Sequence, residues 1–138
     1  MEHEGGCHCG NLWLRLRLTR PAAENPTRSC ACSFCRAHAT RTVSDSRGDI
    51  EIRARDWSRV ERYRFSSATA DYLLCKTCGV YIGAVCETEQ GTRAVTNVNS
   101  LADRADFPPA SSFPDHDDEP VAARIARRMA NWTPAVVL

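Results

Sequence analysis

The clearest pattern in the chain is a strict alternation of apolar and polar positions near its start. From Asn11 to Thr19, every second residue is a leucine, and tryptophan or arginine fills the positions between them. A period of two predicts a strand that buries one face. The residues expected on the buried face are Leu12, Leu14, Leu16 and Leu18.

Shorter apolar segments continue the strand pattern along the first hundred residues. The segments expected as strands are 27–30, 50–53, 63–65, 71–75, 80–86 and 92–98. Stretches rich in serine, aspartate and glycine, such as 44–49, separate them and favour turns. The fold class predicted from this pattern is mainly β, a small antiparallel sheet fold.

The pattern changes after residue 101. Prolines exclude a regular sheet interior between 107 and 114, and an acidic run at 115–119 follows, so this part is expected to be a connecting segment. Pro120 suits a first helical turn. Val121, Ile125 and Met129 then recur at a spacing of four residues, which predicts a short C-terminal helix over about 120–132.

That helix is expected to close its apolar face over the sheet. The arginines expected mostly on its other faces are Arg124, Arg127 and Arg128. The alternative is a helix that docks a protein or a nucleic acid.

Length and charge narrow the function classes. With 138 residues we expect a single domain over 1–138, with its motifs within about 5–98. Eighteen basic and seventeen acidic side chains give a net charge of +1. This net charge is too small to attract a nucleic acid or an anionic membrane to the molecule as a whole. No apolar stretch has the length of a membrane helix, and the first residues do not resemble a secretory signal. We therefore expect a cytoplasmic protein without a membrane or nucleic-acid partner.

Eight cysteines are the anomaly in this composition. Thiols in a reducing compartment seldom end as structural disulfides, so metal binding is the first hypothesis. Seven of the cysteines form three groups, and Cys86, alone at a strand end, is expected to be a small buried apolar residue. The groups are Cys7-His8-Cys9, Cys30-Ala31-Cys32-Ser33-Phe34-Cys35 and Cys75-Lys76-Thr77-Cys78-Gly79.

The last group has the form of a zinc knuckle. In C-x-x-C followed by glycine, a tight turn points two sulfurs at one ion, and the glycine relieves crowding of the backbone. Because a structural zinc needs four donors, another pair must complete the site, and Cys7 with Cys9 is the most economical choice. The sequence thus predicts a structural zinc at Cys7, Cys9, Cys75 and Cys78.

The middle group supplies three sulfurs, Cys30, Cys32 and Cys35, with no fourth cysteine beside them. Three protein ligands and one open position are typical of a catalytic zinc, and three thiolates suit a substrate that carries sulfur. The alternative is that His38 completes a closed structural site. Arg36 is a candidate for contact with a substrate anion, and His38 is a candidate for proton transfer. The other histidines, His3, His8 and His116, are expected to be exposed to solvent.

These three cysteine motifs resemble those of the glutathione-dependent formaldehyde-activating enzyme family, which includes centromere protein V-like domains. The motifs agree in order and approximate spacing from about Gly5 to Val98, whereas residues 103–138 match no motif of that family. The resemblance implies a small all-β fold of the Mss4-like type and two zinc ions per chain, held by the same two sets of cysteines.

The resemblance also implies an activity. The family's name-giving reaction is the reversible addition of glutathione to formaldehyde, which yields S-hydroxymethylglutathione and is formally a carbon-sulfur lyase reaction. We therefore expect a lyase that acts on a glutathione adduct of formaldehyde or another small aldehyde, with glutathione as co-substrate. The alternative function is a non-catalytic zinc-binding interaction module, which a closed tetrahedron completed by His38 would favour.

Overall fold

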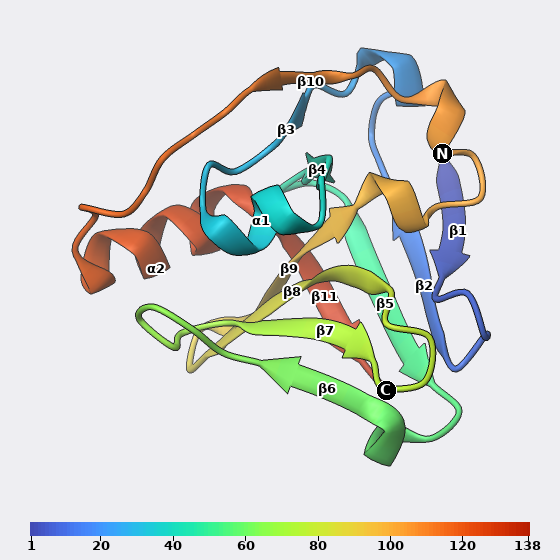
Figure 1. Ribbon diagram of the computed structural model, residues 1–138. Coiled ribbons are helices and arrows are strands. Elements are labelled where there is room, and N and C mark those ends of the chain that lie inside the picture. Colours follow the sequence, from blue (N-terminus) through green and yellow to red (C-terminus); the bar gives the residue numbers. More distant parts are fainter.

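Eleven strands form one hydrogen-bonded network with two parts (Figure 1). The computed structural model describes residues 1–138. In the first part, the strand order is β1-β2-β5-β11. These strands are β1 (Glu2–Gly6), β2 (Leu12–Arg17), β5 (Asp49–Ala54) and β11 (Thr133–Val137).

The second part is built on an antiparallel run of four strands that follow one another in the chain. They are β6 (Val60–Tyr63), β7 (Asp71–Cys75), β8 (Tyr81–Thr88) and β9 (Gly91–Asn97). Three short strands extend the sheet beyond β9 in the order β4-β3-β10. Their bounds are β3 (Thr27–Arg28), β4 (Thr42–Val43) and β10 (Ala110–Ser112).

Strand β11 joins the two parts. Its first residues, Thr133 and Pro134, pair antiparallel with β9. Its later residues, Ala135 to Val137, pair parallel with β5. One strand near the C-terminus therefore belongs to both parts and lies between β9 and β5 (Figure 1).

The main hydrophobic core contains 17 buried residues from both parts. All four alternating leucines of the first long strand belong to it. Ile50 and Ile52 of β5 contribute from the first part, and Leu73 of β7 contributes from the second. The prediction that Leu12, Leu14, Leu16 and Leu18 share the buried face is confirmed.

The mainly β fold class is confirmed, but the sheet is mixed. Most pairings are antiparallel, whereas β11 with β5 and β10 with β3 are parallel. Parallel pairing needs a long connection between its strands. The pattern of a single segment does not specify such a partner, and β11 was not predicted at all.

The helical segments are short. Two are α-helices, α1 (Ser33–Ala37) and α2 (Val121–Asn131). Four are single 3-10 turns: η1 (Ala22–Glu24), η2 (Trp57–Arg59), η3 (Val98–Ser100) and η4 (Arg104–Asp106). Neither α-helix has the length and apolar character that crossing a bilayer requires.

The orientation predicted for the C-terminal helix is wrong. Arg124 and Arg128 are the buried residues of α2, at 8% and 6% exposure, whereas Val121 is 48% exposed. Ile125 and Met129 are only half-buried. The helix does cover the sheet, but with arginines inward, because Arg124 and Arg128 face a cavity and donate there to hydroxyl and carbonyl oxygens.

A matched pair of leucines tests the core. Leu16 is fully buried at 0% exposure, and Leu138 is 55% exposed. We expect Leu16→Ala to lower the free energy of unfolding by about 2–5 kcal/mol, because it removes buried methyl groups and leaves a cavity. Leu138→Ala should change it by less than about 0.5 kcal/mol. Urea denaturation of both variants measures the difference, and equal losses would contradict this core.

Candidate metal centres and the adjoining cavity

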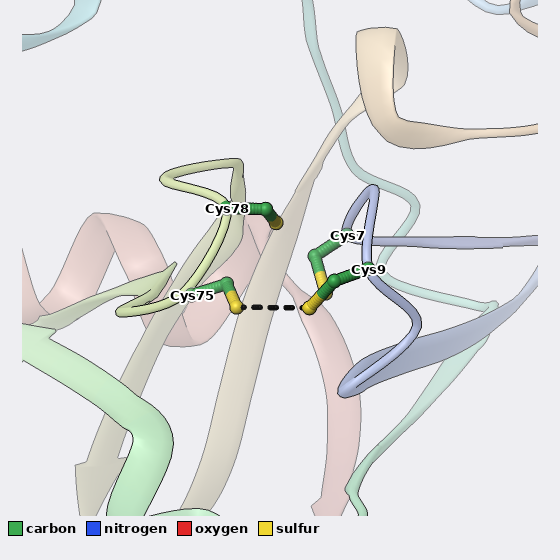
Figure 2. A group of neighbouring side chains, drawn as sticks. All are labelled: Cys7, Cys9, Cys75 and Cys78. Carbon is green, nitrogen blue, oxygen red and sulfur yellow. Dashed lines mark hydrogen bonds between the residues drawn. The ribbon is translucent and has the colours of Figure 1, made fainter.

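The structure brings together four cysteines from two distant turns (Figure 2). Cys7 and Cys9 lie in the turn after β1, and Cys75 and Cys78 lie where β7 turns into β8. Their Sγ atoms all lie within 4.8 Å of one another. Two of the separations are 3.7 Å, from Cys7 to Cys9, and 3.5 Å, from Cys9 to Cys75.

These separations fit one tetrahedral ion. Zinc–sulfur bonds of about 2.3 Å in a tetrahedron place neighbouring sulfurs about 3.8 Å apart. All eight cysteines of the chain are free of disulfides. Four thiolates in this geometry are typical of sites for zinc or iron. The first group can therefore hold a metal without rearrangement of its turns.

The backbone of both turns supports the sulfurs. Gly10 and Gly79 have φ angles of +86° and +78°, which glycine adopts without steric cost. The N–H of Leu12 donates to Cys7 Sγ at 3.1 Å. Burial raises the pKa of Cys75, but hydrogen bonds from the N–H groups of Cys78 and Thr77 and with the side chains of Cys9 and Cys78 together lower that pKa to about 6.

The second group, Cys30, Cys32 and Cys35, lies at the start of α1. Its Sγ atoms are also within 4.8 Å of one another. The side chain of Cys32 caps α1 by accepting a hydrogen bond from the N–H of Cys35 at 3.4 Å, and the N–H of Cys32 donates to Cys30 Sγ at 3.5 Å. The short helix and its cap thus bring three sulfurs of one segment to one point.

The pKa values of two sulfurs of this group, Cys30 and Cys35, shift in opposite directions. A hydrogen bond with Cys35 is the largest cause that lowers the pKa of Cys30, to about 5. The same contact, together with burial, raises the pKa of Cys35. A contact of this kind favours the charged form of one sulfur and the neutral form of the other.

His38 and Arg36 lie outside the three-sulfur group. The ring of His38 packs against Phe34 at a centroid distance of 4.5 Å and against Tyr81 at 5.6 Å. Arg36 is exposed on α1. The group of possible ligands consists of the three cysteines alone, so the group has three protein donors and no fourth.

A cavity of about 100 Å³ adjoins the three sulfurs. Tyr72 of β7 and Tyr81 of β8 line it from the sheet, and α2 closes it on the opposite side. Residues of α1 and α2 face the same cavity. The cavity lining includes Cys30, Cys32 and Cys35 together with four arginines, Arg28, Arg124, Arg127 and Arg128.

Sequence reasoning missed most of this lining. His116 was expected to be exposed, but it lies half-buried against the cavity, where burial lowers its pKa. Buried Arg124 and Arg128 were assigned to the outer faces of the helix. A spacing of four between them was the available signal, because residues four apart share a helix face.

The remaining histidine and cysteine predictions have mixed outcomes. His3 was predicted to be exposed, but it is buried, and its Nδ1 lies 2.6 Å from Asp103 Oδ2. The segment around η4 covers this part of β1, which the local sequence did not reveal. His8 is exposed and Cys86 is buried, as predicted.

Comparison with known proteins identifies related chains. The family model described as glutathione-dependent formaldehyde-activating enzyme matches residues 2–114. A crystal structure of a Rhodobacter sphaeroides protein is similar at 29% identity, with a TM-score of 0.52, over 72% of this chain and 87% of that chain. No curated protein matches the sequence.

The first group should couple metal binding to stability. We expect Zn²⁺ added to metal-free protein to raise the thermal unfolding midpoint by more than about 10 °C, since 1 kcal/mol corresponds to roughly 4 °C in a domain of this size. In Cys75→Ala, most of this increment should be lost, because a sulfur that joins the two turns is missing.

Cys86→Ala is the matched control, because Cys86 is buried but lies in neither sulfur group. Its zinc-dependent increment in the unfolding midpoint should equal that of the unsubstituted chain. Scanning calorimetry with and without zinc measures all three increments. A full increment in Cys75→Ala would contradict the assignment.

Proposed function

Because the chain belongs to the glutathione-dependent formaldehyde-activating enzyme family, we propose that it is a zinc-dependent carbon-sulfur lyase. Its substrate is a glutathione adduct of formaldehyde or of another small aldehyde. The observation that carries the proposal is the opening of a three-sulfur group, Cys30, Cys32 and Cys35, onto a cavity. Three donors beside a partly open cavity suit a site that admits a substrate atom.

The reaction balances with no other reactant. In the forward direction the thiol sulfur bonds to the carbonyl carbon, and the thiol proton ends on the carbonyl oxygen. In reverse, the carbon-sulfur bond breaks and the proton returns to sulfur. A zinc ion at the three cysteines supplies Lewis-acid chemistry, which lowers the pKa of a thiol or polarises a carbonyl.

The residues of the chain hold the reactants in place. The cavity walls, which include Tyr72 and Tyr81, exclude bulk water and restrict the orientation of the adduct, and such positioning raises the rate of a bimolecular addition. The four-cysteine group has the structural role: its metal ties the turn after β1 to the turn between β7 and β8.

Proton transfer by His38 and anion contact by Arg36 remain part of the proposal. Neither side chain lines the cavity, so each would act from outside it. If His38 relays the proton, His38→Gln lowers kcat and shifts its pH profile. A purely packing role against Phe34 would instead leave the pH profile unchanged. Arg36→Gln tests the anion contact through the KM for glutathione.

The alternative, a non-catalytic zinc-binding interaction module, has less support. That function was tied to a closed tetrahedron with His38 as the fourth donor, and His38 lies outside the ligand group. The cavity beside the sulfurs also favours a small-molecule partner over a protein surface. A reaction that uses glutathione suits the reducing cytoplasm, which we propose as its location.

Metal content is the first test. We expect two zinc ions per chain after reconstitution, one in each sulfur group. Cys32→Ser and Cys75→Ser should each retain one ion, and only Cys75→Ser should lose substantial stability. Plasma mass spectrometry against protein concentration gives the count. A single ion in the unsubstituted chain under saturating zinc would remove the second site.

Activity and glutathione binding are the second test. We expect Cys32→Ser to lower the rate of S-hydroxymethylglutathione formation by about 100-fold or more, since even loss of a group that only hydrogen-bonds a metal ligand costs about 10–100-fold. NMR exchange spectroscopy measures the rate above the spontaneous reaction. Calorimetric titration of glutathione into both zinc-loaded proteins checks binding, and equal affinity would exclude glutathione from this site.

A further inference from the structure

The cavity is lined by more positive charge than its own acids neutralise. Four arginines reach it, and three of them, Arg124, Arg127 and Arg128, come from α2. This helix lies outside residues 2–114, which match the family model. The charge of the cavity is therefore a property of this chain's C-terminal segment as well as of β3, which carries Arg28.

Arg128 is the arginine of the four that combines burial with the absence of a carboxylate partner. It is 6% exposed and has no carboxylate partner within 4.0 Å. One guanidinium nitrogen, Nη1, donates to Thr69 Oγ1 at 2.7 Å, and the ring of Trp132 lies 4.9 Å from Cζ. Its buried Nε has no partner. A buried cation with unused donors is costly to maintain unless an anion joins it.

Arg28 of β3 also lines the cavity without a carboxylate partner. Its only side-chain hydrogen bond to a side chain goes from Nη1 to Ser44 Oγ at 3.1 Å. Arg28 is half-buried where it lines the cavity. No carboxylate pairs with Arg28 within 4.0 Å. The two arginines therefore reach one cavity, and neither forms an ion pair with a carboxylate.

Hydroxyl groups accept hydrogen bonds from Arg124 and Arg128 of α2, whereas Arg127 pairs with Glu119. Arg124 donates to Ser67 Oγ at 3.0 Å and to the carbonyl of His116 at 2.7 Å. The loop that supplies the hydroxyls contains Ser66 and Ala68 with φ angles of +57° and +54°. Residues other than glycine adopt this conformation at a cost. The loop is thus strained where it fixes guanidinium groups without neutralising them.

The nearby acids are already engaged or lie at the surface. Glu119 forms a bidentate ion pair with Arg127, with N···O distances of 3.0–3.3 Å. Its Oε1 also lies 3.6 Å from Arg124 Nε. Asp117 lines the cavity but is exposed. Neither acid pairs with Arg28 or Arg128. Besides the cysteine sulfurs that line the same cavity, a ligand can therefore supply negative charge to Arg28 and Arg128.

The size of the cavity limits that ligand. An apolar cavity of about 150 Å³ holds one benzene molecule, and this cavity measures about 100 Å³. A carboxylate with two or three attached atoms fits inside, whereas a tripeptide must lie mostly in the mouth. Arginine suits such a group because its guanidinium donates two parallel hydrogen bonds to one carboxylate.

We propose that the cavity beside Cys30, Cys32 and Cys35 is a carboxylate site formed by Arg28, Arg124 and Arg128, and that this chain acts on an adduct whose acid group lies within a few bonds of the reacting sulfur or carbon. The inference rests on the proposed function for the reaction itself. The acid comes either from the aldehyde, as in glyoxylate, or from a compact thiol, as in mercaptoacetate.

Binding is tested first, with acetate and without any thiol or aldehyde. In protein labelled with ¹⁵N-arginine, we expect acetate to shift the Nε–H resonances of Arg128 and Arg28 to saturation, while that of exposed Arg47 stays unchanged. Arg128→Gln and Arg28→Gln should each weaken acetate binding about tenfold or more, as loss of a hydrogen bond to a charged group implies. Arg47→Gln is the matched control and should bind acetate normally.

Two further measurements keep the test decisive. Because Arg128→Gln removes a buried charged group, Arg128→Lys is made in parallel. Lysine keeps the positive charge but lacks the planar guanidinium, so this variant should still bind acetate more weakly than the unsubstituted chain. Circular dichroism checks the fold of each variant. Absence of saturable shifts in the unsubstituted protein, metal-free and zinc-loaded, would overturn the proposal and leave the arginines as counter-charges for the sulfurs.

The source of the acid is then assigned by turnover. Glyoxylate with 2-mercaptoethanol is compared with formaldehyde plus mercaptoacetate, and formaldehyde with 2-mercaptoethanol is the uncharged reference. We expect one acid-bearing pair to exceed the reference in kcat/KM about tenfold, and Arg128→Gln to abolish that preference. Equal values for all pairs would overturn the proposal. Acetate binding in a protein without lyase activity would refute only the proposed function.

Discussion

The meeting of two turns at four sulfurs is the constraint on which the rest of the structure depends. The turn after β1 belongs to one part of the sheet, and the turn between β7 and β8 belongs to the other. Strand β11 joins the same two parts by hydrogen bonds. Cys7 and Cys75 also belong to the hydrophobic core. A metal at this point would therefore close the long loop between them and restrict the unfolded chain.

The second sulfur group depends on this frame but does not contribute to it. Its three cysteines come from one segment of six residues, so a metal there closes no long loop. Its position matters for another reason. Strands β7 and β8, which the turn with Cys75 and Cys78 connects, present Tyr72 and Tyr81 to the same cavity that the three sulfurs face. The first group therefore lies at one end of the strands that line the cavity, and the second group lines the cavity itself.

Helix α2, which covers the cavity, buries arginines where the spacing of its apolar residues predicted an apolar face. An apolar face inward would have suited a dry interior, yet α2 buries Arg124 and Arg128 and exposes Val121. Hydroxyls of the loop at 66–69 and the ring of Trp132 partly compensate for the desolvation of these guanidinium groups. Unused donors persist at both Nε atoms. A surface arranged in this way is suited to a charged small molecule.

The sequence by itself determined the mainly β class, the buried face of Leu12 to Leu18 and the grouping of the cysteines into ligand sets, because period and short spacing are local properties of a chain. Only the tertiary structure decided the parallel pairing of β11 with β5, the burial of His3 and the inward turn of the arginines. Each of these depends on a partner distant in sequence. A polar side chain can be buried where a residue distant in sequence forms hydrogen bonds with it. The local sequence pattern does not show which distant residue that is.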